Sequence, residues 1–428
     1  MTTAETVRQP RGAFTALSSR SYRIYIAGQS LTNTGSWMQS IAQDWLIFNL
    51  THSSTAVGVT MALQFGPMLL LGMHAGALAD RLPKRSILLT TQSLNAAATL
   101  ALAVVTIAGA VRAADVYAFA LMSGVIFAFD VPARQSFVNE VVPEGRLRAA
   151  IALNAAVFQA TRLIGPAIAS VLIVSVGTGW VFAVNAACYL GPTVGLLLLR
   201  PSDLQSVPHA PRAPGAVRAA VTYLRGRPDV LRTIFLVGVL GTFGLNFPIV
   251  LTAMAKTTFG GNASTYGLFN IVLGLGSAVG AVLAAAGHRP RMRVIVGSAA
   301  AFGLLEAGAA LAPDLAAFLT LLAVMGFVNL VCQAMANASV QLSVDPELRG
   351  RVMGLYMLVF VGGTPIGAPI IGAITSHYGA RAGMLVCGVV PSLAAVVVAV
   401  AAARRLRRAG HGEAIVDPVT VPVAAVRA

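Results

Sequence analysis

Long stretches without a single charged residue dominate this sequence. Residues 163–199, 315–344 and 352–380 each lack Asp, Glu, Lys and Arg. A helix needs about 20 mainly apolar residues to cross a hydrocarbon core roughly 30 Å thick, and each stretch is long enough. Charged residues make up 11% of the 428 residues, against about 25% in soluble domains. The chain is therefore predicted to be an integral membrane protein, which excludes a soluble enzyme, a disordered chain and a nucleic-acid-binding protein.

The apolar stretches predict an all-α membrane protein with twelve transmembrane helices. Residues 163–199 are too long for one helix, and Gly177 and Gly179 divide them between two spans. The expected spans are 22–48, 55–79, 86–109, 115–139, 149–176, 179–199, 231–254, 263–286, 294–312, 315–339, 350–376 and 382–402.

Basic residues are distributed unequally between the two sides of the membrane. With the N-terminus inside, only Arg112, Lys256 and Arg381 fall in outer loops, Arg162 falls within a span, and the other 26 of the 30 lie on the inner side. Inner loops of membrane proteins are enriched in Lys and Arg. The sequence therefore predicts a multi-pass protein of the cell (inner) membrane with both termini in the cytoplasm.

The longest loop divides the chain into two halves of six spans. A shift of 203 residues aligns Arg148 with Arg351 and Pro166 with Pro369. Parallel six-helix repeats occur in secondary transporters, which bind substrate between the repeats. The expected units are an N-terminal cytoplasmic segment 1–21, an N-terminal half 22–199, a cytoplasmic linker 200–230 with an amphipathic segment, a C-terminal half 231–403 and a cytoplasmic tail 404–428.

Residues 76–85, GALADRLPKR, resemble the signature G-x-L-x-D-R-x-G-R-R that major facilitator superfamily transporters carry between their second and third helices. Pro83 stands where the signature has glycine. Residues 130–135 (DVPARQ) and 162–166 (RLIGP) are similar to segments of the drug-exporter branch, which includes enterobactin and macrolide exporters. The resemblance covers roughly 12–403. It implies the major facilitator fold, in which two six-helix halves are related by pseudo-two-fold symmetry.

This resemblance implies a secondary active transporter that works by alternating access, and not an enzyme. The resemblance to the drug-exporter branch implies proton-driven export of amphiphilic organic compounds, such as drugs or a siderophore-like metabolite. The mostly apolar spans are consistent with a bulky, partly apolar substrate. Uptake of a small nutrient and a non-transporting membrane sensor of the same fold are the alternatives. The expected partners are the lipid bilayer, a small organic substrate and protons, and the chain is expected to act as a monomer.

Motifs for catalysis or cofactor binding are missing from the sequence. It has no H-E-x-x-H and no Walker A sequence, which are the patterns of zinc proteases and of P-loop proteins. Cys188, Cys332 and Cys387 each lie within an apolar stretch and are interpreted as small buried apolar residues. No cofactor and no metal are therefore expected.

The superfamily signature supplies an expected inner gate. Asp80 ends the second span, where a carboxylate can accept hydrogen bonds from a helix N-terminus and pair with basic residues. The resemblance implies that Asp80 is a latch that holds the two halves together on the inner side, and a solvated loop charge is the alternative. The gate candidates are Gly76, Asp80, Arg81, Lys84 and Arg85.

Acidic residues within membrane helices are costly and are functional candidates by default. Asp44, near the outer end of the first span, either takes up protons from outside or lies at the interface with Trp45 as part of the aromatic belt. Glu306, about midway through the ninth span, is either a proton site or a protonated acid that forms a hydrogen bond between helices.

Arg162, near the bilayer midplane, needs a carboxylate at similar depth. An antiparallel hairpin of the fourth and fifth spans would place Asp130 beside it, and Arg134, four residues on, can share the same carboxylate. We therefore expect Asp130 to bridge Arg162 or Arg134. The alternative is that Asp130 pairs with Arg134 alone, while Arg162 bonds Gln159 and the backbone.

Polar residues of the first, fourth, seventh and tenth spans are expected to face a central cavity. Asn329, Gln333 and Asn337 recur at every fourth residue and so form one stripe on a helix. Amides also join membrane helices to one another, so helix packing is the alternative role. The candidates for substrate contact are Asn33, Gln39, Asn246, Asn329, Gln333 and Asn337.

Overall fold

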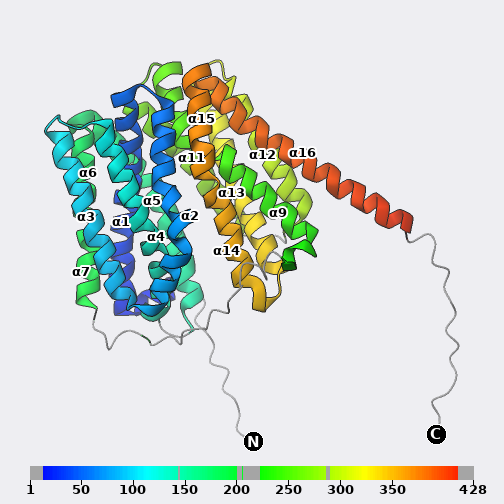
Figure 1. Cartoon of the computed structure of the whole chain (residues 1–428), viewed down its shortest axis with the longest axis horizontal. Helices are drawn as coiled ribbons and strands as arrows, with labels where there is room; N and C mark the ends of the chain where they lie inside the picture. Colours follow the sequence, from blue (N-terminus) through cyan, green and yellow to red (C-terminus); the bar gives the residue numbers. More distant parts are fainter. Residues whose placement is uncertain (1–12, 143–144, 200–204, 206–221, 286–289, 413–428) are drawn as a thin grey trace, which may run out of the picture.

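A computed structural model describes residues 13–142, 145–199, 205, 222–285 and 290–412, and within these ranges the chain is a bundle of helices without a strand (Figure 1). A helix pairs its own backbone N–H and C=O groups with each other. Inside a bilayer this pairing is required, because no water is present to bond these groups. The amphipathic segment expected in the linker lies largely outside the described residues. The all-helical fold expected from the sequence is confirmed.

The N-terminal half follows the six spans expected from the sequence. It begins with a short 3-10 helix, η1, and its sixth span is split at Tyr189, because Pro192 has no amide to bond the carbonyl of Cys188. The elements are η1 (Ala13–Ser18), α1 (Arg20–Thr51), α2 (Ser54–Arg81), α3 (Lys84–Ile107), α4 (Ala113–Val141), α5 (Leu147–Val176), α6 (Thr178–Cys188) and α7 (Leu190–Leu198).

The C-terminal half is less regular. Its seventh span contains two π-helical segments, and Pro248 removes the amide that would bond the carbonyl of Gly244 at the end of the first of them. The eleventh span is interrupted at Gly363. The elements are α9 (Pro228–Val239), η3 (Leu240–Gly244), α10 (Phe247–Ala253), η4 (Met254–Thr258), α11 (Ala263–Ala285), α12 (Met292–Ala310), α13 (Leu315–Ser343), α14 (Pro346–Gly362), α15 (Thr364–Tyr378) and α16 (Ala380–Gly412).

Eleven segments of the described chain are long and apolar enough to cross a membrane. The expected span that is not among these eleven is the first, 22–48. It corresponds to α1, whose 32 residues give a length of about 48 Å at 1.5 Å per residue. Its many amide and hydroxyl side chains make α1 too polar to qualify by composition. It nevertheless packs against α5, α6 and α7 inside the bundle, so α1 completes the set of six helices in its half.

The two halves lie side by side, with α1 to α7 in one and α9 to α16 in the other (Figure 1). We call the end of the bundle at which α1 begins and α2 ends the terminal face, and the end at which α1 ends and α2 begins the opposite face. The halves meet through α2 with α15 and through α5 with α11. Smaller contacts of α1 and α2 with α10, of α1 with α11 and of α2 with α14 also join the halves.

Candidate functional site

The halves are packed tightly together near the opposite face. The backbone amide of Thr55 on α2 donates a hydrogen bond to Ser376 Oγ on α15, over 2.9 Å. Gly58 on α2 lies directly against the carbonyl group of Ala368, and Gly267 on α11 lies against Ser170 on α5, with no room for a Cβ at either glycine. Small residues allow such close approach of membrane helices. This end of the bundle is closed.

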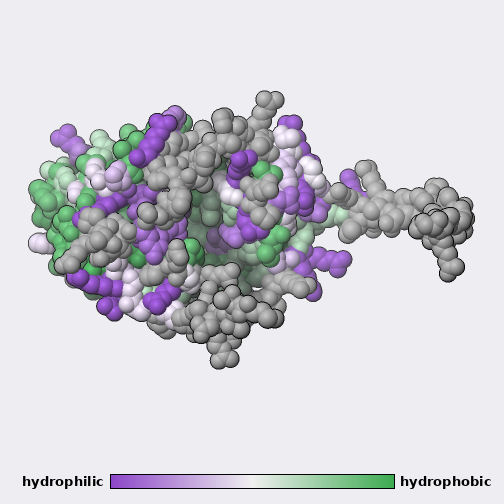
Figure 2. Space-filling view, turned by 90° about the horizontal axis from the view of Figure 1, so that it is seen from below, coloured by the Kyte–Doolittle hydropathy of each residue, from purple (hydrophilic) through white to green (hydrophobic). Residues whose placement is uncertain are grey.

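The terminal face is shaped differently. Figure 2 views this face and shows it hollowed between the two halves, with hydrophobic residues deep in the hollow. A site that is closed at one end and open at the other is one of the two states that alternating access requires. The hollow is the candidate substrate site.

Asp44 joins the two halves near the opposite face. This α1 side chain is 4% exposed, and its carboxylate accepts a hydrogen bond from the Tyr266 hydroxyl of α11 over 2.9 Å. The rings of Trp45 and Tyr266 stack with centroids 6.4 Å apart, and Lys256 Nζ lies 5.6 Å from the centre of the Trp45 ring. An acid, a tyrosine, a tryptophan and a lysine from both halves therefore form one cluster, which we call the Asp44 cluster.

Asp130 and Arg134 form an ion pair on one helix, α4. Arg134 Nε donates to Asp130 Oδ2 over 2.8 Å. The other carboxylate oxygen accepts bonds from Thr91 Oγ1, at 2.8 Å, and from Gln92 Nε2, at 3.0 Å, both on α3. Arg134 Nη2 donates to Oδ2 as well. Four hydrogen bonds thus surround a buried carboxylate, which satisfies its charge and joins α3 to α4.

Arg162 does not join this network. Its guanidinium carbon lies 5.7 Å from the centre of the Trp37 ring, within the range of a cation–π contact, and no ion pair links it to Asp130 in the described structure. The expected hairpin is wrong because α5 packs against α1 and α11 and not against α4. Of the two partners that the sequence offered to Asp130, only Arg134 binds it.

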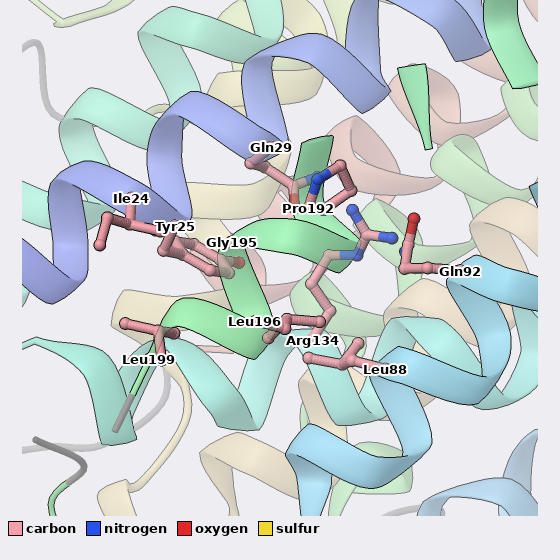
Figure 3. Close-up of a pocket in the computed structure, with 10 residues that line it drawn as sticks. All are labelled: Ile24, Tyr25, Gln29, Leu88, Gln92, Arg134, Pro192, Gly195, Leu196 and Leu199. Carbon is pink, nitrogen blue, oxygen red and sulfur yellow. The ribbon is translucent and has the colours of Figure 1, made fainter. Parts of the chain in front are cut away.

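A pocket lies inside the N-terminal half. It is bounded by α1, α3, α4 and α7, and the Arg134 guanidinium reaches between Gln29, Pro192 and Gln92 (Figure 3). The Tyr25 hydroxyl and Gln92 Oε1 are buried at this pocket without a hydrogen-bond partner in the described structure. Buried polar groups of this kind usually bind water, so the pocket can hydrate the polar network of this half.

Glu306 is isolated within the C-terminal half. It is 0% exposed, and neither carboxylate oxygen has a hydrogen-bond partner among the described residues. Its helix α12 packs against α16 through Gly303 and Gly388. Glu306 therefore lies among its own half's helices and away from the contacts between halves.

Two of the six amide candidates are buried and form hydrogen bonds inside their own half. Gln39 is 7% exposed and Asn246 is 0% exposed. Gln39 Oε1 accepts bonds from Thr99 and Asn185, on α3 and α6, and Asn246 Nδ2 donates to the Thr242 carbonyl over 2.8 Å. Both amides therefore bond within their own half in this conformation, and their contact with substrate stays a prediction.

The other amide candidates form hydrogen-bonded pairs along their helices. Asn33 accepts a bond from Gln29 over 2.9 Å on α1. On α13, Gln333 donates to Asn329 over 2.9 Å, while Asn337 is half-buried. The stripe expected from the spacing therefore exists on α13. Its contact with substrate stays a prediction.

The gate signature bonds to its own half. Gly76 is buried and Arg81 is exposed. Lys84 forms an ion pair with Glu140 of α4 at 2.8 Å, and Arg85 Nε donates to the Leu196 carbonyl of α7 over 2.8 Å. The side chain of Asp80 lies outside the described residues. The latch between halves therefore stays a prediction.

Sequence reasoning missed several residues of these clusters. Tyr266 and Ser376 matter because they contact the other half, and no spacing in the sequence reveals contacts between residues hundreds of positions apart. Thr91 and Gln92 were missed because neutral polar residues in a membrane helix give no strong signal. Gln92 lies four residues from Leu88, which lines the same pocket, so helical periodicity alone could have grouped these two.

The sequence is similar to those of several known transporters. It matches the transmembrane secretion effector family of major facilitator transporters over residues 11–417. It is 27% identical to the multidrug efflux pump Tap of Mycolicibacterium fortuitum over 86% of this chain and 91% of the pump. The enterobactin exporter EntS of Salmonella typhimurium is 26% identical over 76% of this chain and 78% of the exporter. The staphyloferrin A transporter of Staphylococcus aureus is 23% identical, and the chain spans 65% of its length.

Solved structures share the fold. A POT family transporter in complex with a thioalcohol-conjugated peptide has a TM-score of 0.71 and 13% identity, over 90% of this chain and 96% of that one. A bacterial homologue of the iron transporter ferroportin in an inward-facing state has a TM-score of 0.70 and 12% identity, over 89% and 98%.

The fold and the hollow between two six-helix halves define a membrane transporter of the major facilitator class, not an enzyme. The chain belongs to the transmembrane secretion effector family of that class.

Proposed function

We propose that this protein exports amphiphilic organic compounds, drugs or siderophore-like metabolites, across the cell membrane by proton-coupled alternating access. The observation that carries the proposal is the shape of the bundle, closed at the opposite face and hollowed at the terminal face. The hydrophobic residues deep in the hollow suit a partly apolar substrate. The names of the efflux pump Tap and the exporter EntS support export of this kind of compound.

The direction of transport depends on the orientation in the membrane. Basic residues cluster at the terminal face, as Arg20, Arg23, Arg81, Lys84 and Arg85 illustrate, and cytoplasmic loops carry such an excess. We place both termini in the cytoplasm, so the hollow loads substrate from the cytoplasm or from the inner leaflet. A single copy of the chain encloses the hollow, so the transporter acts as a monomer.

Transport into inverted membrane vesicles tests this proposal. The vesicles expose the terminal face, and a fluorescent cationic dye serves as the probe. Energised vesicles that contain the protein should accumulate the dye, and a protonophore should abolish accumulation. Dye movement in the reverse direction would identify an uptake permease. No protein-dependent movement of any of a panel of amphiphiles would favour a membrane sensor.

A further inference from the structure

Among the described residues, Asp44 is the one acidic side chain that bonds to the other half. Its partner, the Tyr266 hydroxyl, donates across the interface over 2.9 Å, and the carboxyl group is almost completely buried by closure of the opposite face. Asp130 and Glu306, the other deeply buried acids, contact only their own halves. Any change in the charge of Asp44 therefore acts on the contact between halves.

We infer that Asp44 is the proton-binding residue of the transport cycle and that its protonation permits the opposite face to close. This inference rests on the proposed function, since it names the residue that couples proton movement to export. Tyr266 is a positioning residue, because its hydroxyl bonds the Asp44 carboxyl group from the other half.

The groups around Asp44 favour its neutral form in the closed state. Tyr266 of α11 offers a neutral donor, and Trp45 of α1 offers a ring. Lys256 of η4, the cation of the cluster, lies over that ring and forms no ion pair with Asp44 in the described structure. A buried carboxylate without a cationic partner disfavours its charged form. Closure around Asp44 therefore requires a proton on it.

The same group meets water when the halves separate. Opening the opposite face withdraws Tyr266 and hydrates Asp44, which stabilises the ionised carboxylate. A proton from the water on that side then binds one carboxylate oxygen, removes the charge and allows the halves to close. Release of that proton to water on the terminal side leaves a buried charge, which destabilises the closed face and allows it to open again. One proton thus enters for each turn of the cycle.

The distance between two spin labels measures how closure of the opposite face depends on pH. Ala110 and Pro313 are exposed at the opposite face, one in each half, and the three native cysteines are buried. Labels on Ala110→Cys and Pro313→Cys report opening of this face. In the otherwise unchanged protein, the closed-to-open ratio should fall as pH rises, by up to about tenfold per pH unit for one linked proton.

Variants at the Asp44 cluster decide whether Asp44 is the group whose protonation is coupled to closure of the opposite face. Asp44→Asn keeps the shape of the side chain without a charge, so its label distance should stay short at every pH. Tyr266→Phe keeps the ring against Trp45 and removes the hydroxyl, so closure should be weaker at every pH while the pH response remains. Full pH-dependent opening in Asp44→Asn would overturn the inference.

Flux in proteoliposomes provides the second test, with Glu306→Gln as the matched change at a buried acid that lies away from the interface. Asp44→Asn should still bind the dye from the terminal side, which shows that it is folded, but should lose accumulation driven by a proton gradient. Loss of gradient-driven accumulation in Glu306→Gln, with Asp44→Asn unaffected, would overturn the inference and leave proton-coupled export standing. A wild-type protein that ignores the gradient would overturn the proposed coupling, and this inference with it.

Discussion

Closure of the opposite face depends on glycines that leave no space for a side chain. Gly58 of α2 lies against the carbonyl group of Ala368 and the Cα of Pro369. These are backbone atoms of α15, so a methyl group at Gly58 can be accommodated only if α2 and α15 separate. Gly66, on the same helix, has no atom within 4 Å of the position its Cβ would take. Gly58→Ala and Gly66→Ala are therefore a matched pair.

The difference between the two variants gives the magnitude. Each change adds the same helix propensity to α2, worth about 0.5–1 kcal/mol, so that contribution cancels in the comparison. Overpacking a filled site costs about 1–3 kcal/mol, and in Gly58→Ala this penalty applies only when the opposite face is closed. The closed-to-open ratio should fall by roughly 5- to 150-fold relative to Gly66→Ala.

The assay is the label distance between Ala110→Cys and Pro313→Cys, measured in lipid nanodiscs at one pH. Gly58→Ala should populate a longer distance than Gly66→Ala, and both should remain folded by their thermal unfolding in detergent. Equal distance distributions for the two variants would refute the reasoning that this glycine contact holds the face closed.

Three further outcomes follow from the described contacts. Asp130→Asn should lower stability by about 3 kcal/mol, the lower end of the range for a broken buried pair, because it leaves the partly buried Arg134 cation without its partner. The double change with Arg134→Gln should cost less than the single change. Thermal unfolding in detergent measures both, and an Asp130→Asn variant as stable as the unchanged protein would contradict the prediction. Glu306→Met should not lower the unfolding temperature, because it removes a buried acid that has no hydrogen-bond partner in the described structure. Marked destabilisation would contradict this prediction and indicate that the carboxyl group forms a hydrogen bond. A topology reporter fused after Arg408 should be active on the cytoplasmic side, and activity only outside would contradict the orientation.

Charge-free stretches predicted the fold well because a bilayer excludes charges and forces the helical conformation. The breaks within spans were harder to predict. Pro166 and Pro369 lie inside the continuous helices α5 and α15, whereas the span that contains Pro192 is broken just before it. Packing decides which proline interrupts a helix, and one sequence does not contain that information.

The candidate site was predicted less completely than the fold. Its charged residues stood out, since charge is rare in these spans, but their partners did not. The Asp130 pair followed from a spacing of four residues on one helix. The bond from Asp44 to Tyr266 joins positions 222 apart in the sequence, and it exists only because the two halves meet in this conformation.

The chemistry of the interface explains why a single proton can control it. Apart from the Asp44 cluster, the described bonds between the halves at the opposite face are made by hydroxyl and backbone groups such as those of Thr55 and Ser376, each worth about 0.5–1.5 kcal/mol net. Glycine contacts add close packing but no charge. Moving a two-state equilibrium from 1:99 to 99:1 takes about 5.5 kcal/mol, and an unpaired buried charge costs several kcal/mol. Ionising Asp44 therefore opposes closure by an energy comparable to that of several of these hydrogen bonds together.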